Sequence, residues 1–361
     1  MPISITDWAN RSIIPTVQWP AILEMDQSRH FLVLDYLEQQ GEWLSEQQIQ
    51  QEQNQQLFLL CHHAKKNSPY YQKTLPVVET VEELSAIWQT IPIVNALLLQ
   101  QEGNLFHSLP SPLAHGPNQA QRIRSHSGAQ FMLLKNRATL FFDALLVMRE
   151  HVWHKRNFYA TYAELHDNSI DKTVFQHESN SVRTHLSWGY PMDSIVKTGQ
   201  KTEFFSDDYS AILEWLVATK ATYLNLNLDQ CQKLTEQIRK QQTVKLNLEQ
   251  LIVPAQGITQ ELRKQAQETI GAQLIGYYKI PELGLIAVQC PETANFHIQV
   301  ENVLLEIVDG EGEYCSYGKQ GRLIATNIHN FSSPLIRYDT GLHATMYTSC
   351  PCGRGAPLLI I

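Results

Sequence analysis

Three thiols and one imidazole near the end of the chain form its most informative pattern. Cys290 and His297 lie in one short stretch, and Cys350 and Cys352 flank a single proline further on. Three cysteines and one histidine are the ligand set of a closed, tetrahedral structural zinc site. A site shared between two distant segments would tie strands together rather than form a free-standing finger. The alternative is that these are ordinary buried cysteines, because free Cys is among the most buried residue types.

The composition is that of a globular protein with ample core material. The chain has 361 residues, 43% hydrophobic and 18% charged. Its formal net charge of −8 without a long basic run argues against nucleic acid or an anionic membrane as the main partner. The longest apolar runs are strand-sized, so no membrane span is expected, and the first residues do not resemble a signal peptide. Six cysteines in so long a chain favour a reduced, cytoplasmic location over a disulfide scaffold.

Helical spacing of apolar residues dominates the beginning of the chain. It recurs through residues 20–60, and a helix is expected to end near Ser68-Pro69, because proline disfavours the helical state of the residue before it. We expect residues 1–75 to form a helical N-terminal segment. The Gln-rich stretch 47–56 is expected to be a solvated helix face. His62 and His63 are expected to pack or to lie at the surface rather than to bind a metal.

Helix and strand patterns alternate from residue 191 onward. Helices are predicted over 207–219, 228–241 and 259–271, the last with Thr259 as N-cap and Gly271 just past its end. Strands are predicted over 222–226, 251–253, 273–278, 283–289, 296–300, 303–308 and 321–327. The alternation indicates an α/β core, and the later strands indicate an antiparallel or barrel-like portion that carries the metal candidates. Residues 118–128 are expected to form a mobile loop.

Several short strings follow one another in a recognisable order. They are SPYY (68–71), WQTIPI (88–93), YKIPELG (278–284), EIVD (306–309), GRLIATN (321–327), PLIRYDTG (334–341) and CPCGR (350–354). Together they resemble motifs of the phenylacetate–CoA ligase-like branch of the adenylate-forming (acyl-CoA synthetase) superfamily. The similarity spans residues 65–355 and is strongest after 270. In that family the Cys–His pattern is associated with a structural zinc.

The resemblance implies a fold, an activity and partners. It implies an α/β fold in which residues 76–361 form the large adenylate-forming domain, with layered sheets and a small barrel-like portion near the C-terminus. The family activates a carboxylate with ATP and Mg²⁺, releases pyrophosphate, and usually passes the acyl group to coenzyme A or a carrier protein. A small aryl or acyl carboxylic acid would be the substrate. Family members often dimerise, although nothing in this sequence specifies an interface.

The resemblance also assigns roles to residues. Glu282 corresponds to the catalytic glutamate linked to Mg²⁺, and Tyr278 to the aromatic residue beside adenine. The phosphate loop is implied at Arg124, Ser125, His126, Ser127 and Gly128. The residues flanking the ribose position are implied to be Asp339 and His343. The acyl pocket is implied at Trp188, Tyr190, Gly199, Gln256 and Gly257. Aromatic and small residues around glycine turns would suit a flat aryl or apolar acid, but they suit an ordinary core equally well.

The chain departs from the family pattern at three places. Only Ser127 and Gly128 match the glycine-rich phosphate loop, so either Arg122, Arg124 and His126 rebuild an anion site or the loop has decayed. Leu342 stands where the ribose-binding Asp is expected, and an apolar side chain cannot accept hydrogen bonds from a ribose. The lysine-bearing C-terminal domain of the family does not follow within the sequence.

Three functional hypotheses remain open on the sequence alone. The first is an adenylate-forming ligase with a structural zinc. The second is a degenerate pseudoenzyme that keeps the fold as a binding or scaffold module, which a thermal shift with ATP–Mg²⁺ would distinguish. The third is a transferase that uses the same pocket for an already activated donor. The sequence contains no G-x-S-x-G elbow, which argues against nucleophilic hydrolysis. It also contains no G-x-G-x-x-G fingerprint after a strand, which argues against dinucleotide binding.

Overall fold

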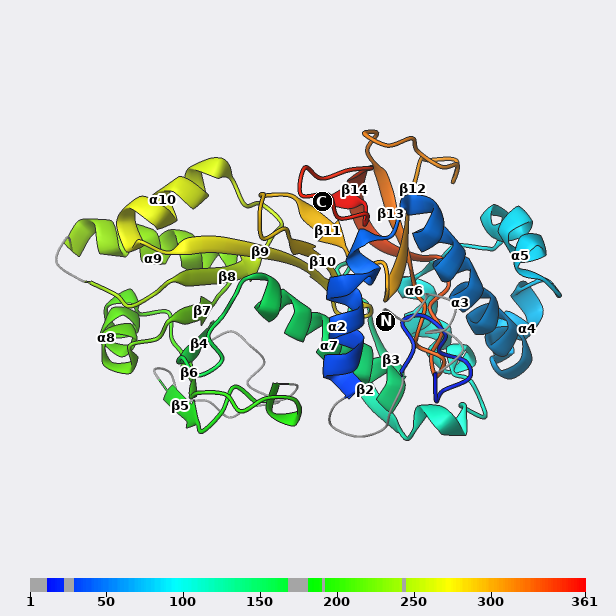
Figure 1. Ribbon diagram of the computed structural model, residues 1–361, viewed down its shortest axis with the longest axis horizontal. Coiled ribbons are helices and arrows are strands. Elements are labelled where there is room, and N and C mark those ends of the chain that lie inside the picture. The colour runs from blue at the N-terminus through cyan, green and yellow to red at the C-terminus, as the bar shows by residue number, and fades with distance from the viewer. Residues whose placement is uncertain (1–11, 23–28, 168–180, 190–191, 242–244) are drawn as a thin grey trace. The chain divides into compact units, whose positions relative to one another are not determined.

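The computed structural model describes residues 12–22, 29–167, 181–189, 192–241 and 245–361 (Figure 1). The chain folds as two compact units. The first unit consists of Met1–Glu150 and Lys279–Ile361, and the second unit of His151–Tyr278. None of the helices in the described ranges is long and apolar enough to cross a membrane.

The second unit is built on a mostly parallel sheet. Its strand order is β9 (Gln273–Ile280), β8 (Gln250–Pro254), β7 (Tyr223–Asn225), β4 (Tyr162–His166), β6 (Lys201–Phe205) and β5 (Ser181–His185). Neighbouring strands are parallel except β5, which is antiparallel to β6. The connecting helices are α8 (Tyr209–Thr219), α9 (Leu228–Gln241) and α10 (Gln260–Ile270). The alternation of helix and strand predicted from the sequence is confirmed here.

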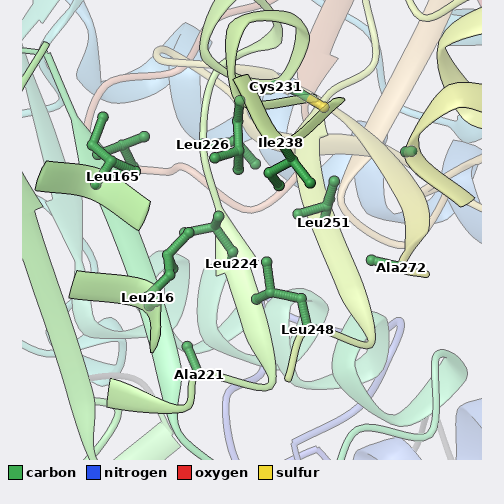
Figure 2. Close-up of a cluster of buried hydrophobic side chains, with 14 of the residues drawn as sticks. Leu165, Leu216, Ala221, Leu224, Leu226, Cys231, Ile238, Leu248, Leu251 and Ala272 are labelled. Carbon is green, nitrogen blue, oxygen red and sulfur yellow. The ribbon is translucent and has the colours of Figure 1, made fainter. Parts of the chain in front are cut away.

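One face of this sheet buries the core of the second unit. Figure 2 shows Leu224 and Leu251 of neighbouring strands beside Leu216 of α8 and Ile238 of α9. The three helices therefore cover the same face, as the yellow and green ribbons of Figure 1 also show. Because side chains alternate along a strand, the residues between the core positions of β4 and β6 lie on the opposite face.

The ends of α10 are set by their local sequence. The Thr259 side chain accepts a hydrogen bond from the Leu262 N–H, which satisfies one of the helix's unpaired donors. Gly271 closes the helix at φ +80°, a left-handed conformation that costs glycine little. Both ends of this helix were predicted from the sequence and are confirmed.

The C-terminal part of the first unit is antiparallel, as predicted. Its strand order is β12 (Val303–Val308), β13 (Gly321–Asn327), β14 (Tyr338–Tyr347), β15 (Leu358–Ile360), β11 (Phe296–Ile298) and β10 (Gly284–Gln289). Each neighbouring pair is antiparallel. The short β1 (Val94–Asn95) pairs in parallel with the start of β14 and so joins the two segments of the unit.

A β-hairpin replaces the loop expected at residues 118–128. β2 (Asn118–Arg124) pairs with β3 (Gln130–Asn136) over their whole length, and α7 (Arg137–Trp153) follows directly. The expectation was wrong because β2 is mostly polar and gives a weak strand signal by itself. Its pairing is stabilised instead by apolar positions of both strands, since Ile123 lies opposite Phe131 and both are buried.

Helices form most of the N-terminal segment of the first unit. They are α2 (Arg29–Gln39), α3 (Glu46–Asn67), α4 (Pro69–Thr74), α5 (Val81–Ile87) and α6 (Ala96–Glu102), with 3-10 turns at Gly41–Trp43, Trp88–Thr90, Gly103–Phe106 and Leu113–His115; a further one, Met192–Ser194, lies in the second unit. A capping box at Ser45 starts α3, and the helix ends before Pro69 as predicted.

The Gln-rich face of α3 is partly buried, which corrects the expectation that it is solvated. Gln53 donates to the carbonyls of Val300 and Val303, and Gln56 donates to the carbonyl of Ile328. These buried amides therefore hydrogen-bond to backbone carbonyls far along the chain rather than to water. His63 packs against Phe331 at 5.3 Å between ring centroids, in agreement with a packing role.

Candidate functional site

Strand pairing brings the four predicted metal ligands together. Cys290 follows β10 directly, His297 lies in β11, and Cys350 and Cys352 lie in the turn between β14 and β15. β11 pairs with both β10 and β15. As a result, one ligand atom from each of the four side chains lies within 4.8 Å of all the others. We call Cys290, His297, Cys350 and Cys352 the Cys–His cluster.

The distances within the Cys–His cluster fit a tetrahedral zinc ion. Zn–S bonds of about 2.3 Å and Zn–N bonds of about 2.0 Å imply S···S distances of about 3.8 Å and S···N distances of about 3.5 Å. The Cys350 and Cys290 sulfurs are 3.9 Å apart, and Cys352 Sγ lies 3.3 Å from His297 Nε2. The cluster could therefore hold zinc with little movement of its ligands.

Surrounding polar groups orient the ligands of the Cys–His cluster. His297 Nδ1 lies 3.1 Å from the carbonyl of Ala356, which fixes the ring with Nε2 toward the sulfurs. Asn295 Nδ2 donates to Cys350 Sγ at 3.5 Å, and the Glu292 N–H donates to Cys290 Sγ at 3.5 Å. Burial raises the pKa of Cys290, but hydrogen bonds from Thr293 and the backbone outweigh it, so its pKa lies below the usual thiol value. A lowered pKa favours the thiolate, which is the form that binds metal, whereas burial raises the pKa of Cys352 in the same cluster to about 11.

The turn that carries Cys350 and Cys352 is followed by residues that contact the 3-10 turn Gly41–Trp43 and the residue after it. Arg354 Nε pairs with Glu42 at 2.8 Å, and its guanidinium lies 5.3 Å from the ring centroid of Trp43. The Gly355 N–H donates to the Glu42 carbonyl, and a Cβ on Gly355 would lie only 1.7 Å from the Leu44 carbonyl oxygen. The backbone approach at this point therefore requires glycine.

The residues predicted to form the phosphate loop make the turn of the β2–β3 hairpin. The Ser125 N–H donates to Ala129 O, the Gly128 N–H donates to Ser125 O, and Gly128 has φ +85°. Ser125 is buried with its hydroxyl 2.9 Å from that of Ser127. Arg124, next to Ser125, and His126 within the turn are exposed, so the turn presents cationic and polar groups suited to an anion.

Glu282 lies in a fixed, buried turn of the same unit. Its side chain is 2% exposed, and Oε1 accepts a 2.7 Å hydrogen bond from the hydroxyl of Tyr338. Oε2 is buried and has no hydrogen-bond partner among the described residues. The pKa of Glu282 is raised above its usual value, because burial outweighs the hydrogen bonds from Tyr338 and from its own backbone and the smaller effect of His126.

The residues predicted to flank the ribose position lie on β14. Asp339 Oδ2 pairs with Arg322 Nη1 at 2.8 Å, and its Oδ1 accepts the Gly341 N–H at 2.9 Å. His343 lies opposite Arg322 in the β13–β14 register and is exposed. Leu342 is partly buried. Both oxygens of Asp339 are therefore already engaged within the protein.

The remaining predicted residues lie in the second unit and at different ends of its sheet. Trp188 is buried, and its Nε1 donates to the Ala160 carbonyl beside Tyr162, the first residue of β4. A Cβ on Gly199 would lie 2.3 Å from the Tyr159 carbonyl oxygen. Gln256 and Gly257 instead follow the carboxyl end of β8, and Tyr278 lies near the end of β9. Tyr190 lies outside the described residues.

A second ionisable cluster was missed by the sequence analysis. Glu164 and His166 of β4 lie beside Glu203 of β6, with ligand atoms within 4.8 Å of one another. Lys201 Nζ pairs with Glu164 at 2.8 Å and with Glu203 at 3.1 Å. The carboxylates of Glu164 and Glu203, 3.5 and 3.8 Å from His166 Nε2, raise the pKa of His166 to about 9. The alternating charges of Glu164-Leu165-His166 and Lys201-Thr202-Glu203 were the available signal.

Comparisons with known proteins place this geometry in context. No family model matches the chain. A phenylacetate–coenzyme A ligase of Thermus thermophilus is 34% identical over 130 residues, which are 34% of this chain and 29% of that protein. A structure of 2-hydroxyisobutyryl-CoA ligase in an open conformation, in complex with 2-HIB-AMP and CoA, matches 88% of this chain and 75% of its own, with a TM-score of 0.67 and 15% identity. The chain has a phenylacetate–CoA ligase-like, adenylate-forming fold.

A further structure supports this adenylate-forming fold. The same 2-hydroxyisobutyryl-CoA ligase in its postadenylation state matches 88% of this chain and 67% of its own, with a TM-score of 0.68 and 14% identity. The adenylate-forming fold thus covers both units of the chain, whereas the sequence similarity to the Thermus ligase covers 29% of that ligase. The predicted mixed α/β class is confirmed.

Proposed function

We propose that the chain activates a carboxylic acid with ATP, forming an acyl- or aryl-adenylate and releasing pyrophosphate. The observation that carries the proposal is Glu282, a buried carboxylate with one oxygen held by Tyr338 and the other without a hydrogen-bond partner in the part of the chain that the structure describes. A carboxylate oxygen in this position is a suitable ligand for Mg²⁺, which is usually bound by one or two carboxylates together with substrate phosphates. The cationic hairpin turn supplies the anion-binding groups on the same unit.

The proposed roles follow the family motifs that each residue resembles. Arg124, His126 and the turn Ser125–Gly128 would contact the phosphates. Asp339 and His343 would lie near the ribose. Because Asp339 forms an ion pair with Arg322, Arg322 would lie near the ribose as well. Tyr278 would lie beside adenine. The carboxylate pocket is proposed at Gln256, Gly257, Trp188, Tyr190 and Gly199.

We further propose coenzyme A as the acceptor of the activated acyl group. The Thermus relative is named a coenzyme A ligase, and the 2-hydroxyisobutyryl-CoA ligase structure contains CoA together with an acyl-adenylate. A small aryl or acyl acid is the proposed substrate class. The proposal predicts that acyl transfer to CoA requires the adenylation reaction first.

Exchange of labelled pyrophosphate into ATP, dependent on added carboxylate, tests the adenylation step. We expect the wild-type protein to catalyse exchange with at least one member of a panel of aryl and aliphatic acids. Glu282→Gln should lower the rate by about 100-fold, since it removes an electrostatic ligand at the reacting phosphates. Glu311→Gln, on an exposed turn, is the matched control. The absence of exchange across the panel would instead favour the pseudoenzyme.

We also propose that the Cys–His cluster binds one structural zinc ion. The four ligand types, their spacing and the hydrogen bonds to the sulfurs support this assignment. All four positions of a tetrahedral site are filled by protein ligands, so the ion would have no open position for catalysis. Metal analysis of protein purified without added zinc should find about one zinc per chain.

A further inference from the structure

The turn that carries Glu282 is held from several sides within the first unit. The carbonyl of Leu283, the next residue, lies 3.4 Å from the amide nitrogens of both Asn302 and Asn327. Gly284 has φ +80°, and a Cβ there would lie 2.7 Å from Asp143 Oδ1. The backbone on the C-terminal side of Glu282 is therefore held by Asn302, just before β12, and by Asn327, at the end of β13, and it packs closely against Asp143 of α7. Its side chain is fixed separately.

Tyr338 is the group that fixes this side chain. The tyrosine is fully buried, and its hydroxyl donates to Glu282 Oε1 at 2.7 Å. A carboxylate that accepts one hydrogen bond and has a buried, unpaired second oxygen is incompletely satisfied. Such a group is expected where a ligand completes the bonding.

We propose that Tyr338 is a positioning residue that holds Glu282 Oε1 and thereby presents Oε2 to the metal ion of a bound metal–ATP complex. This inference rests on the function proposed above and adds a residue to it. Tyr338 itself touches neither metal nor nucleotide in this role. It restricts the carboxylate to one orientation and stabilises its ionised form through the hydrogen bond.

The experiment compares Tyr338→Phe with Tyr71→Phe. Tyr71 is equally buried, and its hydroxyl also makes hydrogen bonds, to Pro334 O at 3.1 Å and from the Ile336 N–H at 3.0 Å. The control therefore removes a buried phenol oxygen of the same unit without touching Glu282. Affinity for Mn²⁺–ATP is measured by water proton relaxation. The pH dependence of pyrophosphate exchange is measured in parallel.

We expect Tyr338→Phe to weaken Mn²⁺–ATP binding by about tenfold, the usual size of a hydrogen bond to a charged group. As the pH is lowered, the exchange activity of this variant should also begin to fall at a higher pH than that of wild type. The reason is that the missing hydrogen-bond donor no longer lowers the pKa of Glu282. Tyr71→Phe should leave both measurements unchanged. If Tyr338→Phe does not fold, Glu282→Asp, whose shorter side chain gives up the Tyr338 bond but keeps the charge, should show the same weakening.

Two other outcomes separate the inference from the proposed function. If Tyr338→Phe matches Tyr71→Phe in both measurements while Glu282→Gln loses Mn²⁺–ATP binding, the role of Tyr338 is overturned and the proposed function stands. If the wild-type protein binds no Mn²⁺–ATP and shows no exchange, the proposed function fails, and the positioning role fails with it.

Discussion

At the scale of single residues, the buried charges of the first unit differ in how completely they are paired. Arg149 donates to both oxygens of Glu301, at 2.8 and 2.9 Å, and also to Gln299, with both charged side chains at most 3% exposed. Glu282 has a partner on one oxygen alone. The first arrangement holds the fold together, whereas the second leaves bonding capacity for a ligand.

Arg149→Met should destabilise the protein strongly. The substitution leaves the Glu301 carboxylate buried without its cation, and breaking such a pair costs about 3–5 kcal/mol. Urea denaturation followed by circular dichroism measures the change in the free energy of unfolding. Lys264→Met, which removes an exposed partner of Glu268 on α10, is the control and should leave the unfolding midpoint in place. A loss no larger than that of the control would show that the Arg149 pair is not important for stability.

Cys352→Ser should abolish stoichiometric zinc binding. A serine hydroxyl is a poor zinc ligand, and the site would keep three of its four protein ligands. Metal analysis after gel filtration should find well below one zinc per chain, and the melting temperature should fall because metal binding is coupled to folding. Cys315→Ser, outside the cluster, is the matched control and should keep its zinc. Equal zinc content in the two variants would contradict the proposed ligand set.

At the scale of elements, the local sequence determines where α10 begins and ends, whereas the formation of β2 as a strand depends on its pairing with β3. Thr259 and Gly271 carry the signals of the two helix ends within a few residues. β2 has a single buried residue, Ile123, and it forms a strand because it pairs with β3 along its whole length. The same difference explains why the polar 118–124 stretch was misjudged while the polar helix α9 was predicted to its last residue.

Thr259→Ala should lower the free energy of unfolding by about 1 kcal/mol, the usual cost of losing an N-cap side chain. Gly271→Ala should cost about 1 kcal/mol as well, since its φ of +80° is unfavourable for a residue with a Cβ. No atom lies within 4 Å of a Cβ at Gly271, so this cost would come from backbone conformation alone. Urea denaturation measures both. Gln267→Ala, at an exposed position of α10, serves as the control and should be nearly neutral.

At the scale of the whole molecule, the first unit closes only when residues far apart in the chain meet. β1 pairs with the start of β14, with Val94 opposite Tyr338, and the Tyr71 hydroxyl bonds to Pro334. His115 and His329 are buried in this unit, and His63 is half-buried. Burial lowers the pKa of His63 and of His115 to about 4 each, and that of His329 to about 3. The division at residue 75 made from the sequence stays a prediction.

Stability should therefore fall as the pH drops from 6.5 toward 4. Above pH 6.5 these histidines are neutral in both the folded and unfolded states and contribute no pH dependence. Between the unfolded pKa near 6.5 and the folded values, the unfolded chain binds more protons, so acid favours unfolding. Urea midpoints measured from pH 7.5 to 4.5 should decrease. His115→Gln should flatten this decrease relative to wild type, and identical slopes for the two proteins would contradict the assignment.

The sequence by itself determined the elements whose signals are local and the order of the family motifs. Caps and periodicity need only neighbouring residues, and they predicted α9, α10 and the later strands. The four residues of the Cys–His cluster were predicted from their types and from the order of the motifs around them. Only the tertiary structure decided which polar groups are buried and with whom they are paired. It buried Gln53 and Gln56, engaged Asp339 with Arg322, and joined Tyr338 to Glu282, because hydrogen bonding between distant segments depends on the packing of strands and helices that no local pattern encodes.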